Sequence, residues 1–382
     1  MGTHTHLGNA MKLKPIYILP ILFALVLAVS LLFMLPGEIN PSLGGTENST
    51  TSEETVETSA NTEEGTEDGT EEGTEPTTEV STEPQPELFS LTFVGDCTLG
   101  TVAAGWNNPV SFVQTVGDNY DYPLANVKYY FENDDFTLIN LEGPLTEGGT
   151  PAQKEFAFRG PTAYTAILKG VEAVSLANNH SLDYGYQGLA DTKAALTAAG
   201  IAYGGREESF IYKTDSGLTI GVYCDDFAFD RGHIADSIAA LKDQCADIVI
   251  CSFHWGEERD YKPNQNEIDW AHVAVDAGAD IVVGHHPHVL QPIEYYNGSV
   301  IMYSLGNFCF GGNNWPSDAD SVIIQQEVVR DVDGTVTLGE LSVVPCSVSS
   351  VQGQNNFQPT PLDYGTEAYD RVIQKLSGTY QE

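Results

Sequence analysis

The sequence is poor in basic residues, and this scarcity argues against several classes of partner. Its 382 residues include 16 Lys and Arg against 54 Asp and Glu, a formal net charge of −38. Nucleic acids and anionic membrane surfaces are bound by basic faces, so we expect neither as the main partner. Apolar residues make up 41% of the chain, enough for a sizeable core in one large domain or two ordinary ones.

Several common catalytic motifs are also missing. The chain has no Gly-x-Ser-x-Gly elbow, no phosphate-cradling Gly-Lys-Ser/Thr loop and no dinucleotide-binding Gly-x-Gly-x-x-Gly after a strand. The six cysteines show no dense spacing, so we expect mostly free, buried thiols rather than a disulfide framework. Cys97 lacks a basic activator nearby in sequence, which makes a thiol nucleophile a minor alternative.

Charge divides the chain into parts. Residues 36–87 hold 15 acidic and no basic residues, and residues 88–382 hold 54 − 15 = 39 acidic and 16 − 2 = 14 basic ones, because the first 35 residues contain only two lysines. The segment 36–87 repeats Thr, Glu and Gly and has little to bury, so we predict a disordered acidic linker. Residues 88–350 are then the main domain, and 351–382 a C-terminal extension.

An uncharged run from Ile16 to Leu35 is long enough to cross a membrane. As an α-helix, its twenty residues would be about as long as the hydrocarbon core of a bilayer is thick. Lys12 and Lys14 precede the run, which favours a cytoplasmic tail over residues 1–15 and an extracellular main domain. A cleaved signal peptide, the alternative, would need a shorter apolar region and a small-x-small cleavage site. We therefore expect a single-pass anchor in the cell membrane.

Short apolar runs alternate with helical patterns in the main domain. This alternation predicts an α/β fold with a mixed sheet or two packed sheets. Strands are expected at 88–94, 136–141, 171–177, 218–224, 247–253, 281–283, 300–303, 322–329 and 336–344. Helices are expected at 187–199 and 267–277, each stopped by a glycine.

Side chains able to bind metals follow five of these strands. They are Asp96, Glu142, Asn179, His180, His254, His286 and His288. The carboxyl ends of strands form the ligand crevice in open α/β sheets, so we expect these residues to meet there. Imidazole nitrogen and carboxylate oxygen suit borderline divalent ions. Each residue alone also fits a turn, a cap or a packed side chain, but the combination favours a metal centre.

Other polar residues have different settings. His233 is expected in a polar loop and His272 on a helix, both with structural roles. Arg159 is a lone cation in an acidic domain, and two readings stay open: it grips an anionic substrate group, or it forms a plain salt bridge. Glu257 and its neighbour Glu258 are expected on a solvated acidic rim, where one of them could orient His254 or a water molecule.

Seven motifs in order resemble the CapA family of poly-γ-glutamate capsule biosynthesis proteins, over about residues 90–312. They are Val94-Gly95-Asp96, Asn140-Leu141-Glu142-Gly143-Pro144-Leu145, Phe158-Arg159, Ala177-Asn178-Asn179-His180-Ser181-Leu182-Asp183-Tyr184-Gly185, His254-Trp255-Gly256-Glu257-Glu258, Gly284-His285-His286-Pro287-His288-Val289 and Tyr303-Ser304-Leu305-Gly306-Asn307-Phe308. That family is similar to calcineurin-like metallophosphoesterases. The resemblance implies a four-layer αββα sandwich of two mixed sheets and one or two divalent ions, whether manganese, iron or zinc.

The resemblance also implies roles for individual residues. The first metal would be held by Asp96 and His288, with Glu142 as the bridge. The second would be held by Asn179, His254 and His286, and His180 would be the acid near the leaving group. Substrate-binding roles fall to Arg159, Glu257 and Asn307. Two departures stand out: Thr98 replaces a histidine ligand of the wider superfamily, and Glu142 replaces an aspartate, which predicts a weaker or empty first site.

The resemblance implies a part in the synthesis, export or processing of capsule poly-γ-glutamate. The favoured chemistry is metal-assisted hydrolysis or transfer on a phosphoester or γ-glutamyl bond. The alternative is a non-catalytic module that binds or guides an anionic polymer in a membrane export complex, and a metal-stabilised structural domain is a third reading. The expected partners are the membrane, through residues 16–35, capsule synthesis or export proteins, and an anionic polymer. Divalent cations with Arg159 would locally offset the repulsion between acidic domain and polyanion.

Overall fold

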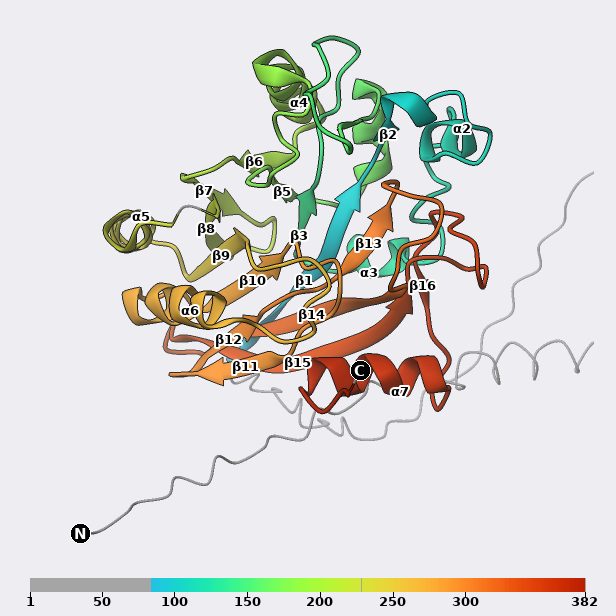
Figure 1. Ribbon diagram of the computed structural model, residues 1–382. Coiled ribbons are helices and arrows are strands. Elements are labelled where there is room, and N and C mark those ends of the chain that lie inside the picture. The colour runs from blue at the N-terminus through green and yellow to red at the C-terminus, as the bar shows by residue number, and fades with distance from the viewer. Residues whose placement is uncertain (1–83, 228, 382) are drawn as a thin grey trace, which may run out of the picture. The chain divides into compact units, whose positions relative to one another are not determined.

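The structure, a computed structural model, describes residues 84–227 and 229–381 (Figure 1). The predicted cytoplasmic tail, the predicted anchor at 16–35 and nearly all of the predicted acidic linker lie outside these residues. Among the helices of the described residues, none has the length and apolar character needed to cross a membrane.

Two mixed sheets form the centre of the described unit. The strands of the first sheet are β1 (Glu87–Thr98), β3 (Phe136–Leu141), β5 (Ala173–Ser175), β6 (Ala202–Gly204), β13 (Asn307–Phe310), β14 (Asp320–Arg330), β15 (Val336–Ser347) and β16 (Thr360–Pro361). Their order is β16-β15-β14-β1-β3-β5-β6, and β13 also pairs with β1. The strands of the second sheet are β7 (Glu208–Lys213), β8 (Thr219–Asp226), β9 (Ile248–His254), β10 (Ile281–His285), β11 (Ile293–Tyr296) and β12 (Ser299–Met302), in the order β11-β12-β10-β9-β8-β7. A small pair joins β2 (Thr101–Val102) to β4 (Phe158–Arg159).

The main core lies between the two sheets. Successive side chains of a strand point to opposite faces, so alternate residues of each strand enter this core. Leu91 and Phe93 enter it from β1, and Ile220 and Val222 enter it from β8. The remaining residues of these strands point to the outer faces of the sheets.

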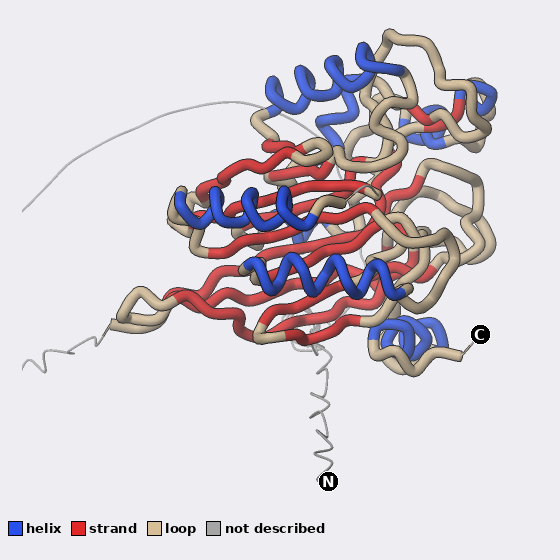
Figure 2. The backbone as a smooth tube through the Cα atoms, turned by 60° about the vertical axis from the view of Figure 1, so that its left-hand side comes forward, coloured by secondary structure: helices blue, strands red, loops and turns tan. Residues whose placement is uncertain are grey.

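Helices cover the outer face of each sheet (Figure 2). On the first sheet, a second core includes side chains from α2 (Phe112–Val116), α3 (Lys128–Glu132), α4 (Gly185–Ala199) and the 3₁₀ helix η2 (Thr162–Leu168); a short 3₁₀ turn, η1 (Ala103–Gly105), follows β2. On the second sheet, a third core includes side chains from α5 (Arg231–Asp243) and α6 (Gln265–Ala277). The layers are therefore helix, sheet, sheet and helix, and the predicted α/β fold of mixed sheets is confirmed.

Local signals set several element bounds as expected. Strand β3 has the predicted bounds, and α4 and α6 end at Gly200 and Gly278, both in the left-handed conformation that glycine adopts readily. Helix α6 begins with a capping box in which Asn264 and Glu267 bond to each other's backbone amides.

Other local predictions need correction. Strand β1 runs past its predicted end to Thr98, so Asp96 lies inside the strand rather than after it, because β13 pairs alongside. His233 was expected in a loop but lies on α5, whose first turn is capped by the Asp230 side chain accepting from the His233 backbone amide at 2.9 Å.

Residues after 350 contribute to the same unit. Strand β16 pairs with β15, and helix α7 (Glu367–Leu376) inserts Val372 and Leu376 into the core between the sheets. The segment set apart in the sequence as an extension therefore supplies both a strand and a core-packing helix.

Parallel pairing brings the functional strand ends to one edge. In the first sheet, β1, β3 and β5 are parallel neighbours and Asp96 lies beside Asn140; in the second, β9 and β10 are parallel and His254 lies beside His285. Close backbone approach helps, because a Cβ at Gly95 would lie 2.1 Å from the carbonyl oxygen of Gly306. Only glycine fits at that crossing.

Candidate metal centre

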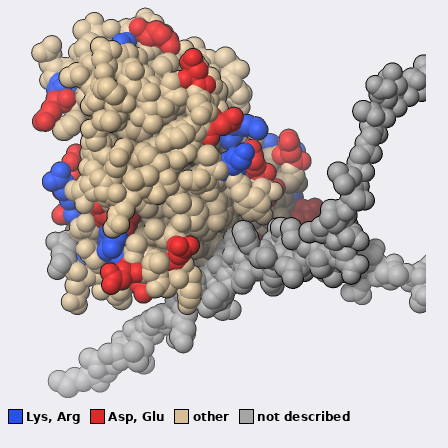
Figure 3. Space-filling model, turned by 90° about the vertical axis from the view of Figure 1, so that its right-hand side faces the viewer, with Lys and Arg blue, Asp and Glu red and all other residues tan. Residues whose placement is uncertain are grey.

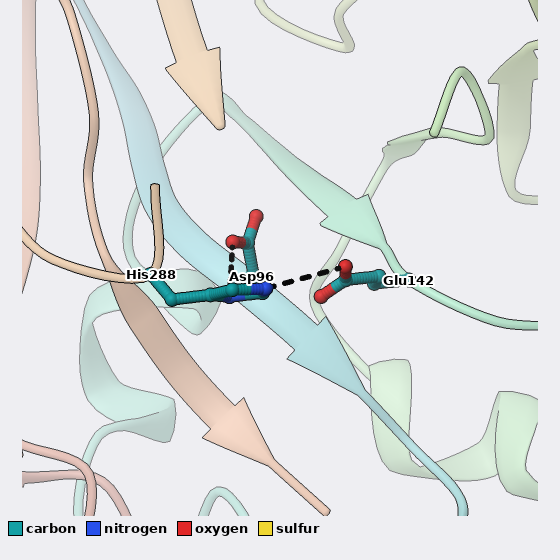
Figure 4. Close-up of side chains that lie close together, drawn as sticks. All are labelled: Asp96, Glu142 and His288. Carbon is teal, nitrogen blue, oxygen red and sulfur yellow. Dashed lines mark ion pairs between the residues drawn. The ribbon is translucent and has the colours of Figure 1, made fainter. Parts of the chain in front are cut away.

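Asp96, Glu142 and His288 converge from three elements (Figure 4). Asp96 lies in β1, Glu142 directly follows β3, and His288 lies in the loop after β10. His288 lies between the two carboxylates, with Nδ1 3.1 Å from Asp96 Oδ2 and Nε2 3.8 Å from Glu142 Oε1. One potential ligand atom from each residue lies within 4.8 Å of the other two.

Glu142 Oε1 is the centre of the arrangement. It is buried and has no hydrogen-bond partner among the described residues. Three imidazole Nε2 atoms surround it, from His180 at 3.8 Å, His254 at 3.9 Å and His288 at 3.8 Å. These separations are too long for hydrogen bonds but suit atoms that share a cation about 2 Å from each. The residues therefore fit a divalent metal ion.

The second expected ligand set also gathers here. His254 Nε2 lies 3.0 Å from Asn179 Oδ1, and the ring centroids of His254 and His286 are 4.8 Å apart. His286 Nδ1 is buried and has no partner among the described residues. His286 and His288 have φ angles of 97° and 56°, a rare backbone conformation for non-glycine residues that concentrates at functional sites.

The surroundings shift the pKa values of these side chains. Burial lowers the pKa of His254 well below its usual value and, with the charge of His288, lowers the pKa of His286 to about 4. Both rings are therefore neutral at pH 7, the form in which imidazole binds metals. Burial raises the pKa of Glu142.

Asp96 and His288 behave as an ion pair. Burial would raise the pKa of Asp96, but the hydrogen bonds and charges of His285 and His288 hold it well below its usual value. Burial opposes a charge on His288, but the carboxylates of Glu142 and Asp96 raise the pKa of that ring to about 10. A cation bound by His288 would displace this proton, because imidazole binds metals in its neutral form.

His180 is oriented toward the cluster by its own partner. Its Nδ1 lies 2.7 Å from Asp183 Oδ2, which places the Nδ1 hydrogen on that contact and leaves Nε2 facing Glu142. Asp183 also accepts from the Phe158 amide at 2.6 Å and pairs with Lys154 Nζ at 2.5 Å. Asp183 Oδ2 is thus shared by the His180 ring and the Phe158 amide, while Oδ1 faces the Lys154 ammonium.

The remaining predicted site residues occupy different positions. Asn307 Oδ1 lies 3.0 Å from His288 Nδ1, so this side chain supports the cluster. The guanidinium of Arg159 lies between the rings of Trp106 and Tyr184, at 4.6 and 4.9 Å, and also donates to a backbone carbonyl. Glu257 is exposed on the loop after β9. Among the contacts of the described residues, none joins Arg159 or the Glu257 side chain to the metal cluster.

Thr98, which the resemblance implies replaces a histidine ligand, lies beside the cluster. Its hydroxyl group donates to Glu142 Oε2 at 3.4 Å, so it helps to orient that carboxylate. A hydroxyl in this place leaves the first set with Asp96, Glu142 and His288 alone.

Four residues of the cluster were missed in the sequence: Asn140, Asn178, Asp183 and His285. Their contacts include Asn140 Nδ2 donating to Asp96 Oδ1 at 2.8 Å and His285 Nδ1 lying 3.2 Å from the same oxygen. All four lie inside the family motifs named above, and two also stand at a telling spacing from a predicted site residue. Asn140 shares a strand face with Glu142 because it lies two residues before it, and Asp183 stands three residues after His180.

The cysteines agree with the sequence expectation. All six are free, and only Cys245 is exposed. Burial raises the pKa of Cys97 to about 12, so its thiol stays protonated at neutral pH. The minor alternative of a thiol nucleophile loses support.

Comparisons with known proteins agree on the family. The sequence model described as "Bacterial capsule synthesis protein PGA_cap" matches residues 90–312. The PGA biosynthesis protein CapA of Bacillus subtilis is 30% identical over 320 residues, 76% of this chain and 78% of that protein. The capsule biosynthesis protein CapA of Bacillus anthracis is 34% identical over 295 residues, 69% of this chain and 68% of that protein.

Among solved structures, NAD nucleotidase (NadN) of Haemophilus influenzae matches with a TM-score of 0.40 at 13% identity. The match covers 77% of this chain and 63% of the nucleotidase, so this chain spans less than two thirds of that protein. The family assignment rests on the sequence relationships, and on them this chain belongs to the family of bacterial capsule synthesis proteins that includes CapA.

Proposed function

We propose that this protein acts in the biosynthesis of capsule poly-γ-glutamate as a metal-dependent hydrolase or transferase. Family membership supports the pathway, since the two Bacillus relatives carry the names PGA biosynthesis protein and capsule biosynthesis protein. The bond acted on is a phosphoester or a γ-glutamyl amide. The anchor expected at residues 16–35 would hold the described unit on the outer side of the cell membrane.

The observation that carries the metal chemistry is the buried, unpartnered Glu142 Oε1 among three imidazole Nε2 atoms. In this proposal Asp96, Glu142 and His288 hold one cation. Glu142 and the set Asn179, His254 and His286 hold a second. A bound divalent ion would activate water and polarise the scissile group. The mixed nitrogen and oxygen donors suit manganese, iron or zinc.

His180 supplies the proton in this proposal. In its doubly protonated form His180 keeps the Nδ1 hydrogen on Asp183 and directs the second proton, on Nε2, toward Glu142, so it could pass that proton to a leaving group bound there and become neutral. Because the two ring nitrogens have separate partners, the ring does not need to turn to donate.

Aromatic rings wall the cluster. Phe158 lies 4.6 Å from the His180 ring, Phe227 lies 4.8 Å from the His286 ring, and Phe310 lies 5.4 Å from the His288 ring. Apolar walls lower the local dielectric and strengthen interactions between the polar groups and a bound substrate.

Because the protein has a net negative charge, a polyanionic substrate would have to be attracted by positive groups close to the site. Figure 3 shows one face of the molecule, where acidic and basic side chains occur in small mixed groups among uncharged ones. Beside the cluster, Lys154 Nζ lies 3.3 Å from His180 Nδ1, and about a third of its side chain is exposed. Bound cations and Lys154 together would offset the repulsion.

The test uses purified full-length protein. Metal content is measured by mass spectrometry, and turnover is measured with bis(p-nitrophenyl) phosphate, γ-glutamyl-p-nitroanilide and poly-γ-glutamate, with and without a chelator. We expect bound divalent metal and chelator-sensitive turnover on one of these substrates.

The variants His254→Ala and His288→Ala should lose metal and turnover. His272→Ala is the matched control, because this histidine lies on α6 and stacks on Tyr296 at 3.7 Å. Wild-type protein that binds no divalent metal would overturn the proposal. Metal binding without turnover on any substrate would instead favour a polymer-binding module.

A further inference from the structure

Two buried asparagines connect the candidate metal ligands to the His180 loop. Asn140 lies in β3 and Asn178 follows β5, and both side chains are buried. Asn140 Nδ2 donates to Asp96 Oδ1 at 2.8 Å, and Asn140 Oδ1 accepts from Asn178 Nδ2 at 3.0 Å. Asn178 Oδ1 then accepts from the His180 backbone amide at 3.1 Å. The contacts form an unbroken chain across three neighbouring strands.

The chain also reaches the second ligand set. Asn140 Nδ2 also lies 3.4 Å from His254 Nδ1, so one amide group is close to both Asp96 and His254. Asn178 Nδ2 makes a second bond, to the Leu141 carbonyl oxygen at 3.0 Å, which locks its orientation. One residue, Asn140, therefore contacts a side chain from each expected ligand set.

Only an amide satisfies this position. Ionised Asp96 accepts hydrogen bonds and cannot donate, so its partner must be a donor, while Asn178 Nδ2 requires an acceptor. A carboxylate at position 140 would repel Asp96, and an apolar residue would leave buried polar atoms unpaired. The orientation of the Asn140 amide follows from these partners.

We propose that Asn140 and Asn178 are positioning residues that hold the metal ligands and the His180 loop in one fixed arrangement. The inference rests on the metal centre proposed above. The two asparagines act through Asp96 and His180 and do not themselves contact the cation or the substrate. Side chains that orient metal ligands typically change metal affinity or activity by about 10- to 100-fold when removed.

The experiment measures Mn²⁺ affinity by titration calorimetry on full-length protein, together with the unfolding midpoint of the metal-free form. Asn140→Ala is expected to weaken Mn²⁺ binding by about 10- to 100-fold. The double variant Asn140→Ala/Asn178→Ala should be about as weak as Asn140→Ala alone, since both residues act in one chain. Asn133→Ala is the matched control, because this exposed amide also donates one bond, to the Tyr129 carbonyl oxygen at 2.8 Å.

A second variant of nearly unchanged shape tests the same chain in case Asn140→Ala does not fold. Asn178→Asp keeps the shape and the acceptor for the His180 amide but removes the donor to Asn140, so it should also weaken Mn²⁺ binding. Wild-type affinity in Asn140→Ala or in Asn178→Asp, with binding lost in His254→Ala, would overturn the positioning role and leave the metal centre standing. Independent, multiplying effects in the double variant would also overturn it. No Mn²⁺ binding by wild-type protein would overturn the metal centre, and the positioning role with it.

Discussion

At the scale of single residues, the surroundings of each histidine in the cluster determine where its ring carries hydrogen. Asp183 holds the Nδ1 hydrogen of His180 at 2.7 Å, and burial keeps the rings of His254 and His286 neutral. His288, in contrast, has a raised pKa because two carboxylates face it. The cluster therefore orients His180 through Asp183 and keeps His254 and His286 neutral, the form in which imidazole binds metals.

Replacement of His180 by alanine tests the acid role. We expect turnover to fall by about 10²- to 10⁴-fold, the usual contribution of a general acid, while bound metal stays near the wild-type amount. His233→Ala serves as control, because this ring lies on α5 next to Tyr223, at 5.9 Å. The measurement is steady-state turnover on the substrate found above, with metal content determined on the same samples. Full turnover in His180→Ala would show that another group donates the proton.

At the scale of elements, the last helix is tied to the sheets by a buried ion cluster. Lys375 of α7 is almost fully buried, and its Nζ lies 2.5 Å from Asp318 and 2.7 Å from Asp320. Arg371 donates to the same Asp320 at 2.6 Å. Since Asp320 begins β14, the cluster fixes α7 against the first sheet.

The variant Lys375→Met tests whether this buried ion cluster stabilises the protein. Removing Lys375 leaves the buried carboxylate of Asp318 without a cation, while Arg371 still pairs with Asp320, so we expect a loss of about 3–5 kcal/mol in the free energy of unfolding. Urea unfolding followed by circular dichroism provides the measurement. Lys169→Met is the control: its ion pair with Glu132 spans 3.4 Å and its side chain is 76% exposed, so a change within about 0.5 kcal/mol is expected. Equal effects of the two substitutions would contradict a stabilising role of the cluster.

At the scale of the whole molecule, the excess of carboxyl groups lowers the free energy of unfolding as pH rises. Residues 88–382 alone hold 39 acidic against 14 basic residues. Some carboxyls have no cation beside them: burial, helped by the charge of Asp134, raises the pKa of Glu172 to about 7, and burial raises the pKa of Asp134 to about 6. These groups favour the protonated form in the folded protein.

The variant Glu172→Gln tests whether ionisation of this buried carboxyl group destabilises the folded protein. An acid whose pKa is higher in the folded state binds more protons there, so the free energy of unfolding falls as pH rises from 4.5 to about 7. Glutamine keeps an acceptor for the Thr137 amide, which bonds Glu172 at 2.7 Å, but cannot ionise. We expect the variant to be more stable than wild type at pH 8, with the difference shrinking toward pH 5.

Urea unfolding at pH 5, 6, 7 and 8 measures this difference. Exposed Glu340→Gln controls for the substitution itself. Curves for Glu172→Gln and wild type that stay parallel across the range would show that Glu172 ionises freely in the folded state.

Much of the element pattern was predictable because its causes are local. A short apolar run predicted β3, and a glycine in the left-handed conformation ends α4 and α6 where the sequence placed their stops. The end of β1 was not predictable in this way, because β3 and β13, the latter more than 200 residues away, extend the pairing past Asp96. Helix α7 was not predicted from the sequence. Its buried residues pack against the same sheet.

The sequence by itself determined which side chains stand at the carboxyl ends of the strands. It thus identified Asp96, Glu142 and His288, which the structure brings within ligand distance of one another. Only the tertiary structure decided what holds them: Asn140 and Asn178 join neighbouring strands, and the pairing partners come from distant segments.

Arg159 shows the same limit. The sequence left its role open, and the structure lays its guanidinium between Trp106 and Tyr184. The physical reason is common to all these cases: strand periodicity and turn chemistry act between near neighbours, whereas the orientation of a buried polar side chain depends on donors and acceptors that packing brings together from distant segments.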